Sequence, residues 1–161
     1  QEGREADEAF RIVHAKARDN ARTPMQWDAS TGAGFTDGTP WLRPTDQAEV
    51  NVIREEASGR ILPYYKRLIA LRKTMPVVSE GTYEPYAPDH PDVLAYIRRH
   101  ERHHLLVICS FRGHETEIDV PEDLLDAEVL ISNCPAPPLR PRMQLRPYEA
   151  LALLGPRVTA P

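Results

Sequence analysis

Two arginines in one short stretch carry the clearest chemistry of this sequence. Arg18 and Arg22 lie within the run Arg18-Asp-Asn-Ala-Arg-Thr-Pro-Met-Gln-Trp27. A guanidinium group presents a fork of N–H donors that meets a carboxylate bidentately. The chemistry that this stretch offers is therefore recognition through paired hydrogen bonds.

A group of histidines is the second candidate for chemistry, as metal ligands. His100 and His103 fall in the turn expected between two antiparallel strands, and His104 directly follows that turn. Such a turn does not fix ligand geometry, and no Cys or Asp cluster completes a coordination shell. We therefore expect no metal site. The polar residues of Pro88–Asp92, a turn bracketed by prolines, are explained by turn chemistry alone.

Composition narrows the functional classes. The chain has 161 residues and a formal net charge of −4, without a basic stripe, which disfavours nucleic-acid binding. No apolar run approaches the ~20 residues of a membrane span. Cys109 and Cys134 do not make a disulfide framework, and we expect buried free thiols in a cytoplasmic protein. The chain opens on Gln1 in a polar, helix-like segment without a signal peptide, so we expect a sequence that has been cut.

Helical periodicity indicates two helices in the first half of the chain. Ala9, Phe10, Ile12 and Val13 give Ala6–Ala15 one apolar face. The clearer helix is Ile61–Thr74, whose apolar residues follow a three-four spacing and which Pro76 is expected to end.

Between these helices lies a loop rich in Gly, Asp and Pro, beginning at Asp28. Such a long loop is usually functional or packed against something larger. We expect Trp27, Phe35 and Trp41 to pack this loop rather than to stack on a ligand.

After Pro76 the apolar pattern changes to the alternation typical of strands. Seven short strands are predicted, which favours an antiparallel sandwich, with a domain boundary near Val77–Gly81. The segment Arg99–His103 is expected to be the connection between the second and third strands. The predicted strands are Thr82–Tyr86, Val93–Arg99, His104–Phe111, Glu115–Val120, Glu128–Ser132, Met143–Leu145 and Glu149–Leu154.

The Arg18–Trp27 stretch, continued by Asp28, resembles a segment of glycoside hydrolase family 13. It is most similar to the group of α-glucosidases, oligo-1,6-glucosidases and trehalose-6-phosphate hydrolases. Smaller matches follow in the order of that family, over nearly everything from Ala9 to Leu154. They are Ala33-Gly-Phe, Pro40-Trp, Val50-Asn-Val, Tyr64-Tyr-Lys-Arg-Leu-Ile-Ala-Leu-Arg-Lys, Gly81-Thr-Tyr, Val93-Leu-Ala-Tyr-Ile-Arg, Ser132-Asn and Leu145-Arg-Pro-Tyr-Glu-Ala.

This resemblance implies an α+β chain taken from the C-terminal end of such an enzyme. Residues 1–76 would be the end of a (β/α)8 catalytic barrel, with a substrate-wall loop and the last barrel helix. Residues 77–161 would be the C-terminal antiparallel β-sandwich domain. A barrel commonly needs ~250 residues, so residues 1–76 cannot close one.

The resemblance gives this chain no catalytic residue. A retaining glycosidase needs two carboxylates ~5 Å apart. The nucleophile, acid/base Glu and stabilising Asp of the family all precede the matched segment, and no motif in this sequence corresponds to them. By resemblance, Arg18 is the arginine that reaches the subsite of the non-reducing glucose, where it pairs with an Asp from an early barrel loop. Arg22 is the second candidate for that role.

We therefore expect the C-terminal part of an exo-acting, retaining α-glucosidase that hydrolyses terminal α-linked glucose from short oligosaccharides. The expected partners are an oligosaccharide and the N-terminal portion of the barrel, without cofactor, metal, nucleic acid or membrane. By itself, the chain is expected to lack hydrolytic activity. The alternative is a stand-alone β-sandwich module that binds carbohydrate or protein without catalysis.

Overall fold

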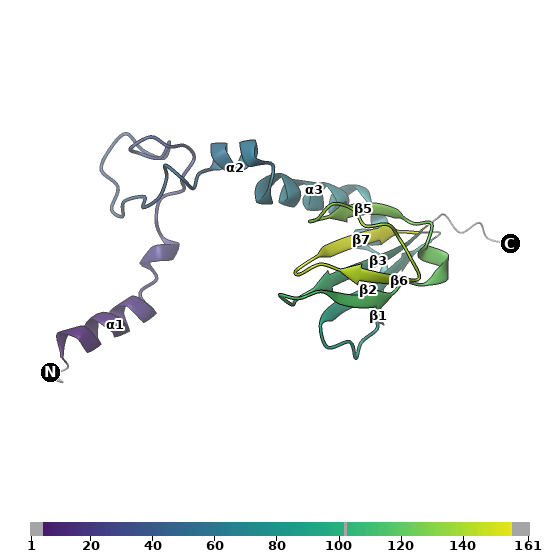
Figure 1. Ribbon diagram of the computed structural model, residues 1–161. Helices are drawn as coiled ribbons and strands as arrows, with labels where there is room; N and C mark the ends of the chain where they lie inside the picture. The colour runs from purple at the N-terminus through teal and green to yellow at the C-terminus, as the bar shows by residue number, and fades with distance from the viewer. Residues whose placement is uncertain (1–4, 102, 156–161) are drawn as a thin grey trace. The chain divides into compact units, whose positions relative to one another are not determined.

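The computed structural model describes residues 5–101 and 103–155, so the expectations for Gln1 and for Arg102, within the expected Arg99–His103 connection, lie outside the described residues. The chain divides into two compact units, Gln1–Tyr64 and Tyr65–Pro161. Figure 1 shows helices along the first half of the chain and strands along the second.

The first unit is helical at both ends and irregular in between. Helix α1, Ala6–Lys16, has the predicted start and runs one residue beyond the predicted end. Acidic residues in its first turn and basic residues in its last turn match the helix dipole. None of its described residues is buried. A one-turn 3-10 helix, Asp19–Ala21, is followed by a long loop that reaches Asn51.

Helix α2, Val52–Ser58, was not predicted, although its end signals are present in the sequence. The side chain of Asn51 caps it by accepting a hydrogen bond from the Arg54 backbone N–H at 2.9 Å. Gly59 ends it in the left-handed conformation, at φ 68°. The Oε1 atom of Glu55 then accepts from the backbone N–H of Ile61 at 2.6 Å, at the start of the next helix.

Helix α3, Ile61–Thr74, has the predicted bounds. Pro76 does not simply end the helical region, because the one-turn helix α4, Pro76–Ser79, begins there. Proline is accepted at this position since a helix needs no donor in its first turn.

The second unit contains all seven predicted strands, with ends within a residue or two of the prediction. Five strands form an antiparallel sheet in the order β1-β2-β3-β7-β5, and β4 pairs with β6 in a two-stranded sheet. The strands are β1 Thr82–Tyr86, β2 Val93–His100, β3 His103–Ser110, β4 Thr116–Asp119, β5 Glu128–Ser132, β6 Arg142–Leu145 and β7 Ala150–Leu154.

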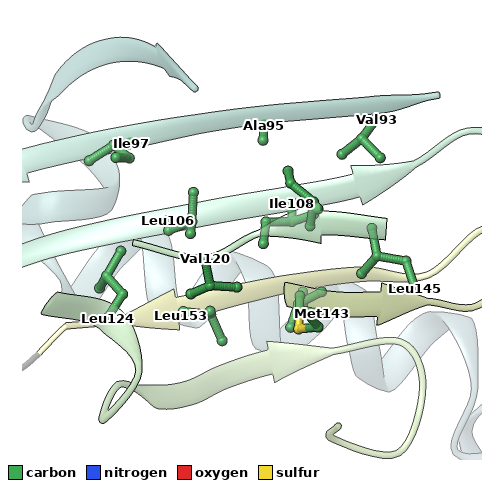
Figure 2. Packing of buried hydrophobic residues seen from close by; sticks show 12 residues of the cluster. Val93, Ala95, Ile97, Leu106, Ile108, Val120, Leu124, Met143, Leu145 and Leu153 are labelled. Carbon is green, nitrogen blue, oxygen red and sulfur yellow. The ribbon is translucent and has the colours of Figure 1, made fainter. Parts of the chain in front are cut away.

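A buried apolar cluster lies between the two sheets, as Figure 2 shows. Leu106 and Ile108 of β3 are 0% exposed, and Met143 and Leu145 of β6 meet them from the two-stranded sheet. Val93, Ala95 and Ile97 alternate along β2 with more exposed residues, which is the period-two pattern that predicted this strand. We call the side of the five-stranded sheet that carries this cluster the inner face.

Candidate functional site

Arg18 stands at the start of the 3-10 helix, where its own backbone shapes the turn. Its φ and ψ are −96° and 13°, and its carbonyl accepts from the backbone N–H of Ala21 at 3.1 Å. The side chain is exposed, and within the described residues no partner holds its guanidinium. Such a group can donate its full fork to a ligand or to a carboxylate from another polypeptide.

Arg22 ends the same turn but has a local partner. Its Nη1 atom lies 3.7 Å from Oδ1 of Asp19, three residues earlier, and both side chains are about half exposed (54% and 55%). An exposed pair of this kind contributes little to stability. The structure brings Arg18 and Arg22 to the two ends of one turn, and Arg18 has the more available guanidinium.

Gln26 closes the long loop through both atoms of its side-chain amide. Nε2 donates to Asp46 Oδ1 at 2.9 Å and to the Val50 carbonyl at 2.7 Å. Oε1 accepts from the backbone N–H groups of Thr45 and Asp46 at 3.3 and 3.4 Å. The Gln26 carbonyl also accepts from Val52 at 3.0 Å. Gln26 thus fixes the chain that follows the Arg18–Arg22 turn against the start of α2.

A second set of contacts tightens the loop near Asp28. Asp28 Oδ1 accepts from the backbone N–H of Ser30 at 2.8 Å, and hydrogen bonding by Ser30 lowers the pKa of Asp28. Ala33 is 0% exposed and its carbonyl accepts from Trp27 at 2.8 Å. Gly34 has φ 65°, and a Cβ there would lie 2.7 Å from Asp28 Oδ2, so the position requires glycine.

The aromatic side chains of the loop do not pack it, so that expectation is wrong for the structure described. Trp27, Phe35 and Trp41 are 49%, 55% and 81% exposed. The physical reason is that polar contacts of Gln26 and Asp28, together with the small Ala33, already order the loop. Phe35 instead lines a hollow with polar neighbours that include Thr36, Asp37, Arg43 and Gln47.

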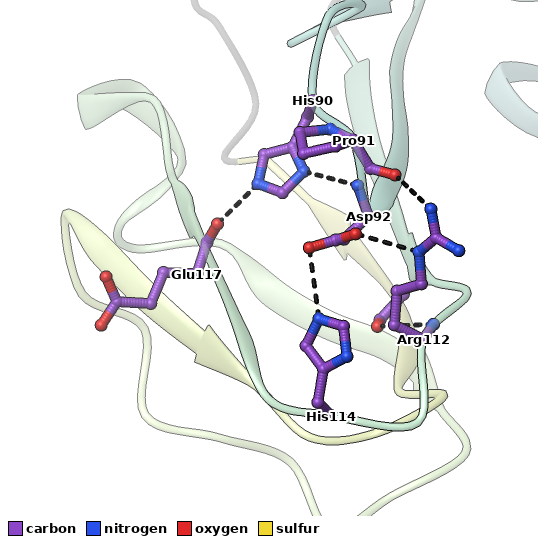
Figure 3. Close-up of polar contacts among 7 residues, drawn as sticks. His90, Pro91, Asp92, Arg112, His114 and Glu117 are labelled. Carbon is purple, nitrogen blue, oxygen red and sulfur yellow. Dashed lines mark hydrogen bonds and ion pairs between the residues drawn. The ribbon is translucent and has the colours of Figure 1, made fainter.

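A polar cluster in the second unit joins two loops to a strand, as Figure 3 shows. Asp92 Oδ1 accepts from Arg112 Nε at 2.9 Å, and Oδ2 lies 3.3 Å from His114 Nε2. His90 Nδ1 accepts from the Asp92 backbone N–H at 3.2 Å, which leaves Nε2 to donate to the Glu117 carbonyl at 2.9 Å.

Electrostatics in this cluster favour an ionised Asp92. Partial desolvation acts to raise its pKa, but the hydrogen bonds and charges of Arg112 and His114 outweigh it and leave the pKa below the ordinary 3.8. These contacts tie the turn at Asp92 to the loop of Arg112 and His114 and to strand β4. Sequence patterns explained Asp92 by turn chemistry and missed Arg112, since nothing local marks a partner so far along the chain.

Two of the histidines considered as metal ligands lie near the carboxylates of different residues. His100 Nε2 lies 3.7 Å from Glu80, and the buried His104 has its Nε2 3.8 Å from Asp123. Over residues 5–101 and 103–155, no three His, Cys, Asp or Glu side chains are grouped to hold a metal ion.

Glu149 is the one acidic side chain that is buried in the part of the chain described. Its Oε2 atom accepts from the Arg146 backbone N–H at 2.9 Å and so closes the turn between β6 and β7. No second buried carboxylate accompanies it among those residues, so they contain no buried carboxylate pair of the kind a retaining glycosidase uses.

The two cysteines are free, and both are half-buried rather than buried as expected. Burial raises the pKa of the Cys109 thiol. No helix in the described ranges is long and apolar enough to cross a bilayer.

Comparison with known proteins finds matches both for the first part of the chain, which contains the loop, and for the second part, which contains the strands. Residues 1–81 match the family described as "Alpha amylase, catalytic domain", and residues 83–151 match "Maltogenic Amylase, C-terminal domain". The trehalose-6-phosphate hydrolase of Bacillus subtilis is 41% identical over 158 residues, which cover 93% of this chain and 27% of that protein. The oligo-1,6-glucosidase of Halalkalibacterium halodurans is 40% identical, covering 89% of this chain and 27% of the relative.

The same group is found among solved structures. The crystal structure of Bacillus licheniformis trehalose-6-phosphate hydrolase aligns with a TM-score of 0.79 and 37% identity, covering 96% of this chain and 29% of that one. The chain therefore spans less than a third of the length of these relatives. The match of residues 1–81 to a catalytic domain does not favour the stand-alone binding module that was the alternative expectation.

Proposed function

The chain belongs to the alpha-amylase family, and on that premise we propose that it is the C-terminal part of an exo-acting, retaining α-glucosidase. The enzyme would hydrolyse terminal α-linked glucose from short oligosaccharides. The observation that carries the proposal is the turn from Arg18 to Arg22. Within the described residues, the Arg18 guanidinium has no partner, and it lies beside a loop that Gln26 holds in place.

In this proposal Arg18 binds and positions the substrate. Its guanidinium donates to hydroxyls of the non-reducing glucose and pairs with an Asp that another part of the barrel supplies. A charged wall at that point would end the pocket, so that only terminal glucose units are removed. Arg22 is the second candidate, and its ion pair with Asp19 makes it the weaker one.

Bond cleavage is assigned to carboxylates outside this chain. A nucleophilic carboxylate would attack the anomeric carbon while a carboxylic acid protonates the leaving oxygen, and water would then hydrolyse the glycosyl-enzyme with retention. This chain contributes positioning of the sugar and a support for the barrel.

The proposed architecture divides the chain into two parts. Residues 1–76 are the end of a (β/α)8 barrel, with the substrate-wall loop and the last barrel helix. Residues 77–161 are a C-terminal antiparallel β-sandwich. The partners are the oligosaccharide and the N-terminal portion of the barrel. Both cysteines are free thiols, which suits a reducing compartment, and we place the protein in the cytoplasm.

A chimeric enzyme tests this function. In the chimera, this chain replaces the 27% of the B. subtilis trehalose-6-phosphate hydrolase with which it aligns. Proton NMR of the chimera acting on an α-linked oligosaccharide is expected to show single glucose units released first as the α anomer. Release of longer products, or of β-glucose first, would contradict the exo-acting or the retaining part of the proposal.

A further inference from the structure

A hollow of about 380 Å³ lies in the second unit, between the turn that follows β1 and the two-stranded sheet. Ala87 and His90 line it from the turn, Glu117 and Asp119 from β4, and Arg142 from β6. Its volume falls within the range of about 300–1,000 Å³ that is typical of small-molecule sites. The proposed function uses none of these residues, so the hollow calls for an explanation of its own.

Two hydrogen bonds to β4 fix the walls of the hollow. The ring of His90 has its Nε2 atom 2.9 Å from the Glu117 carbonyl, as Figure 3 shows. The hydroxyl of Tyr86, at the end of β1, donates to the Asp119 carbonyl at 2.9 Å. These contacts hold the turn and the strand together at two points, so the hollow is formed without a ligand.

Side chains on the solvent side of the two-stranded sheet give the hollow its charged groups. Ile118 and Met143 are 4% and 2% exposed and belong to the inner cluster. Their neighbours Glu117, Asp119 and Arg142 therefore point to the opposite side. Arg142 Nε pairs with Glu117 Oε2 at 2.7 Å, which orients the guanidinium. Over residues 5–101 and 103–155, its Nη atoms and the Asp119 carboxylate have no partner.

Tyr86 adds an aromatic ring and a hydroxyl oxygen to the hollow. Burial is the main cause that raises the pKa of its phenol, and the negative charges of Asp119 and Asp123 raise it further. The phenol therefore keeps its proton at neutral pH and donates it to the Asp119 carbonyl, which leaves its oxygen free to accept.

These groups favour a neutral ligand that is rich in hydroxyls. The carboxylates of Glu117, Asp119 and Asp123 disfavour phosphate and other anions. The guanidinium of Arg142 disfavours a cation, and no metal-binding group of side chains is found in the described ranges. A hydroxyl donates to a carboxylate and accepts from a guanidinium, so a sugar satisfies both kinds of group. The apolar face of a sugar ring can also pack against an aromatic ring.

We propose that this hollow binds a glucose unit of an α-linked oligosaccharide, in addition to the contact proposed for Arg18. The guanidinium of Arg142 donates to the hydroxyls of the sugar, the carboxylates of Glu117 and Asp119 accept from them, and the ring of Tyr86 covers one face. The chemistry of the hollow selects a carbohydrate. The choice of α-linked glucose rests on the proposed function.

Titration of the free chain with maltotriose, followed by amide NMR, tests the proposal. We expect saturable shifts with one common Kd at the amides of Ala87, His90, Glu117 and Asp119. The absence of saturable shifts at these amides would overturn the proposal, even if the Arg18–Arg22 turn responds. Inorganic phosphate and calcium chloride are titrated in parallel. A lower Kd for either at the same amides would also overturn it, because the ligand would then be an ion.

Two exposed arginines of the same loop provide the matched comparison. Arg142→Ala should raise the Kd roughly tenfold or more, because it removes charged hydrogen-bond donors. Arg140→Ala should leave the Kd unchanged, since Arg140 is exposed and is not among the residues that line the hollow. Asp119→Asn keeps the shape of the side chain, removes its charge and should also weaken binding. Shifts that neither Arg142→Ala nor Asp119→Asn weakens would contradict the proposed site.

Further results separate this site from the proposed function. Arg18→Ala should not change the binding of maltotriose at the hollow, because Arg18 belongs to the first unit. An inactive chimera, together with a free chain that binds maltotriose at the hollow, would contradict only the proposed function. An active chimera whose hollow does not bind the sugar would overturn only the present proposal.

Discussion

At the scale of single residues, Arg18 and Gln26 divide two tasks within one motif. Gln26 uses both ends of its amide inside the loop, while Arg18 has no partner in the described residues and is available to bind. Their types suit these tasks, because an amide both donates and accepts whereas a guanidinium only donates.

The first prediction concerns the two arginines in the chimera. Arg18→Ala should lower kcat/KM by roughly 10- to 150-fold, since a hydrogen bond to a charged group is worth about 1.5–3 kcal/mol. Arg22→Ala removes only an exposed ion pair with Asp19 and should change kcat/KM less than about threefold. Steady-state kinetics with a chromogenic α-glucoside measures both, and the opposite ranking would move the role to Arg22.

The second prediction uses the lowered pKa of Asp92. A carboxyl whose pKa is lowered by folding stabilises the protein above its unfolded pKa, and this stabilisation is lost as the pH falls through the folded pKa. Asp92→Asn should therefore lower the urea midpoint at pH 7, and its difference from the unsubstituted chain should shrink below pH 3.8. Asp89→Asn, an exposed change in the same turn, is the control and should have little effect at either pH. A constant difference at every pH would contradict the ionised cluster.

At the scale of elements, the alternation of apolar residues made the strands predictable, whereas the short helices could not be predicted in this way. Buried and more exposed residues alternate along β2, because each strand contributes one face to the core. Both faces of this strand are largely apolar near its centre, so its sequence alone did not indicate which face would be buried. Helix α2 was not predicted because the segment is too short for its apolar residues to show a helical period, although Asn51 and Gly59 mark its ends. The exposed aromatics of the loop were misjudged because burial there depends on long-range contacts that composition does not reveal.

The third prediction tests the end of α2. Gly59 adopts φ 68°, and a Cβ added there would meet no atom within 4 Å, so Gly59→Ala changes only the backbone energy. We expect a loss of about 1–2 kcal/mol of local helix stability. Gly38→Ala, at a position without positive φ, should cost less. Amide exchange across α2 distinguishes the two, and equal effects would refute the role given to the glycine.

The fourth prediction tests the inner face of the five-stranded sheet against the opposite face. Leu106→Ala removes a side chain that is 0% exposed and should cost roughly 2–5 kcal/mol of unfolding free energy. Leu94→Ala, at 48% exposure, should cost less than about 1 kcal/mol in the free chain. Urea unfolding followed by circular dichroism compares them. A similar cost for both would mean that the side chain of Leu94 is already packed in the free chain.

At the scale of the whole molecule, the order of the sequence motifs identified the family. Apolar periodicity and composition alone indicated only a fold that contains both helices and strands. The period change after Pro76 separated helices from strands, and composition excluded broad classes. Neither could assign Arg18 a role, because the carboxylate and the sugar proposed to meet it lie outside the chain. The domain division at 76/77 remains a proposal. The compact units divide earlier, between Tyr64 and Tyr65, so that α4, which packs against β2 and β3, belongs to the second unit.

Whether this chain completes a glucosidase is decided by the initial rate of hydrolysis of a chromogenic α-glucoside. Three proteins are compared: the free chain, the B. subtilis enzyme without the 27% that aligns with this chain, and the chimera of the two. We expect turnover by the chimera alone. Turnover by the free chain that is abolished by replacing one of its own carboxylates, or a folded chimera without activity, would contradict the proposed function.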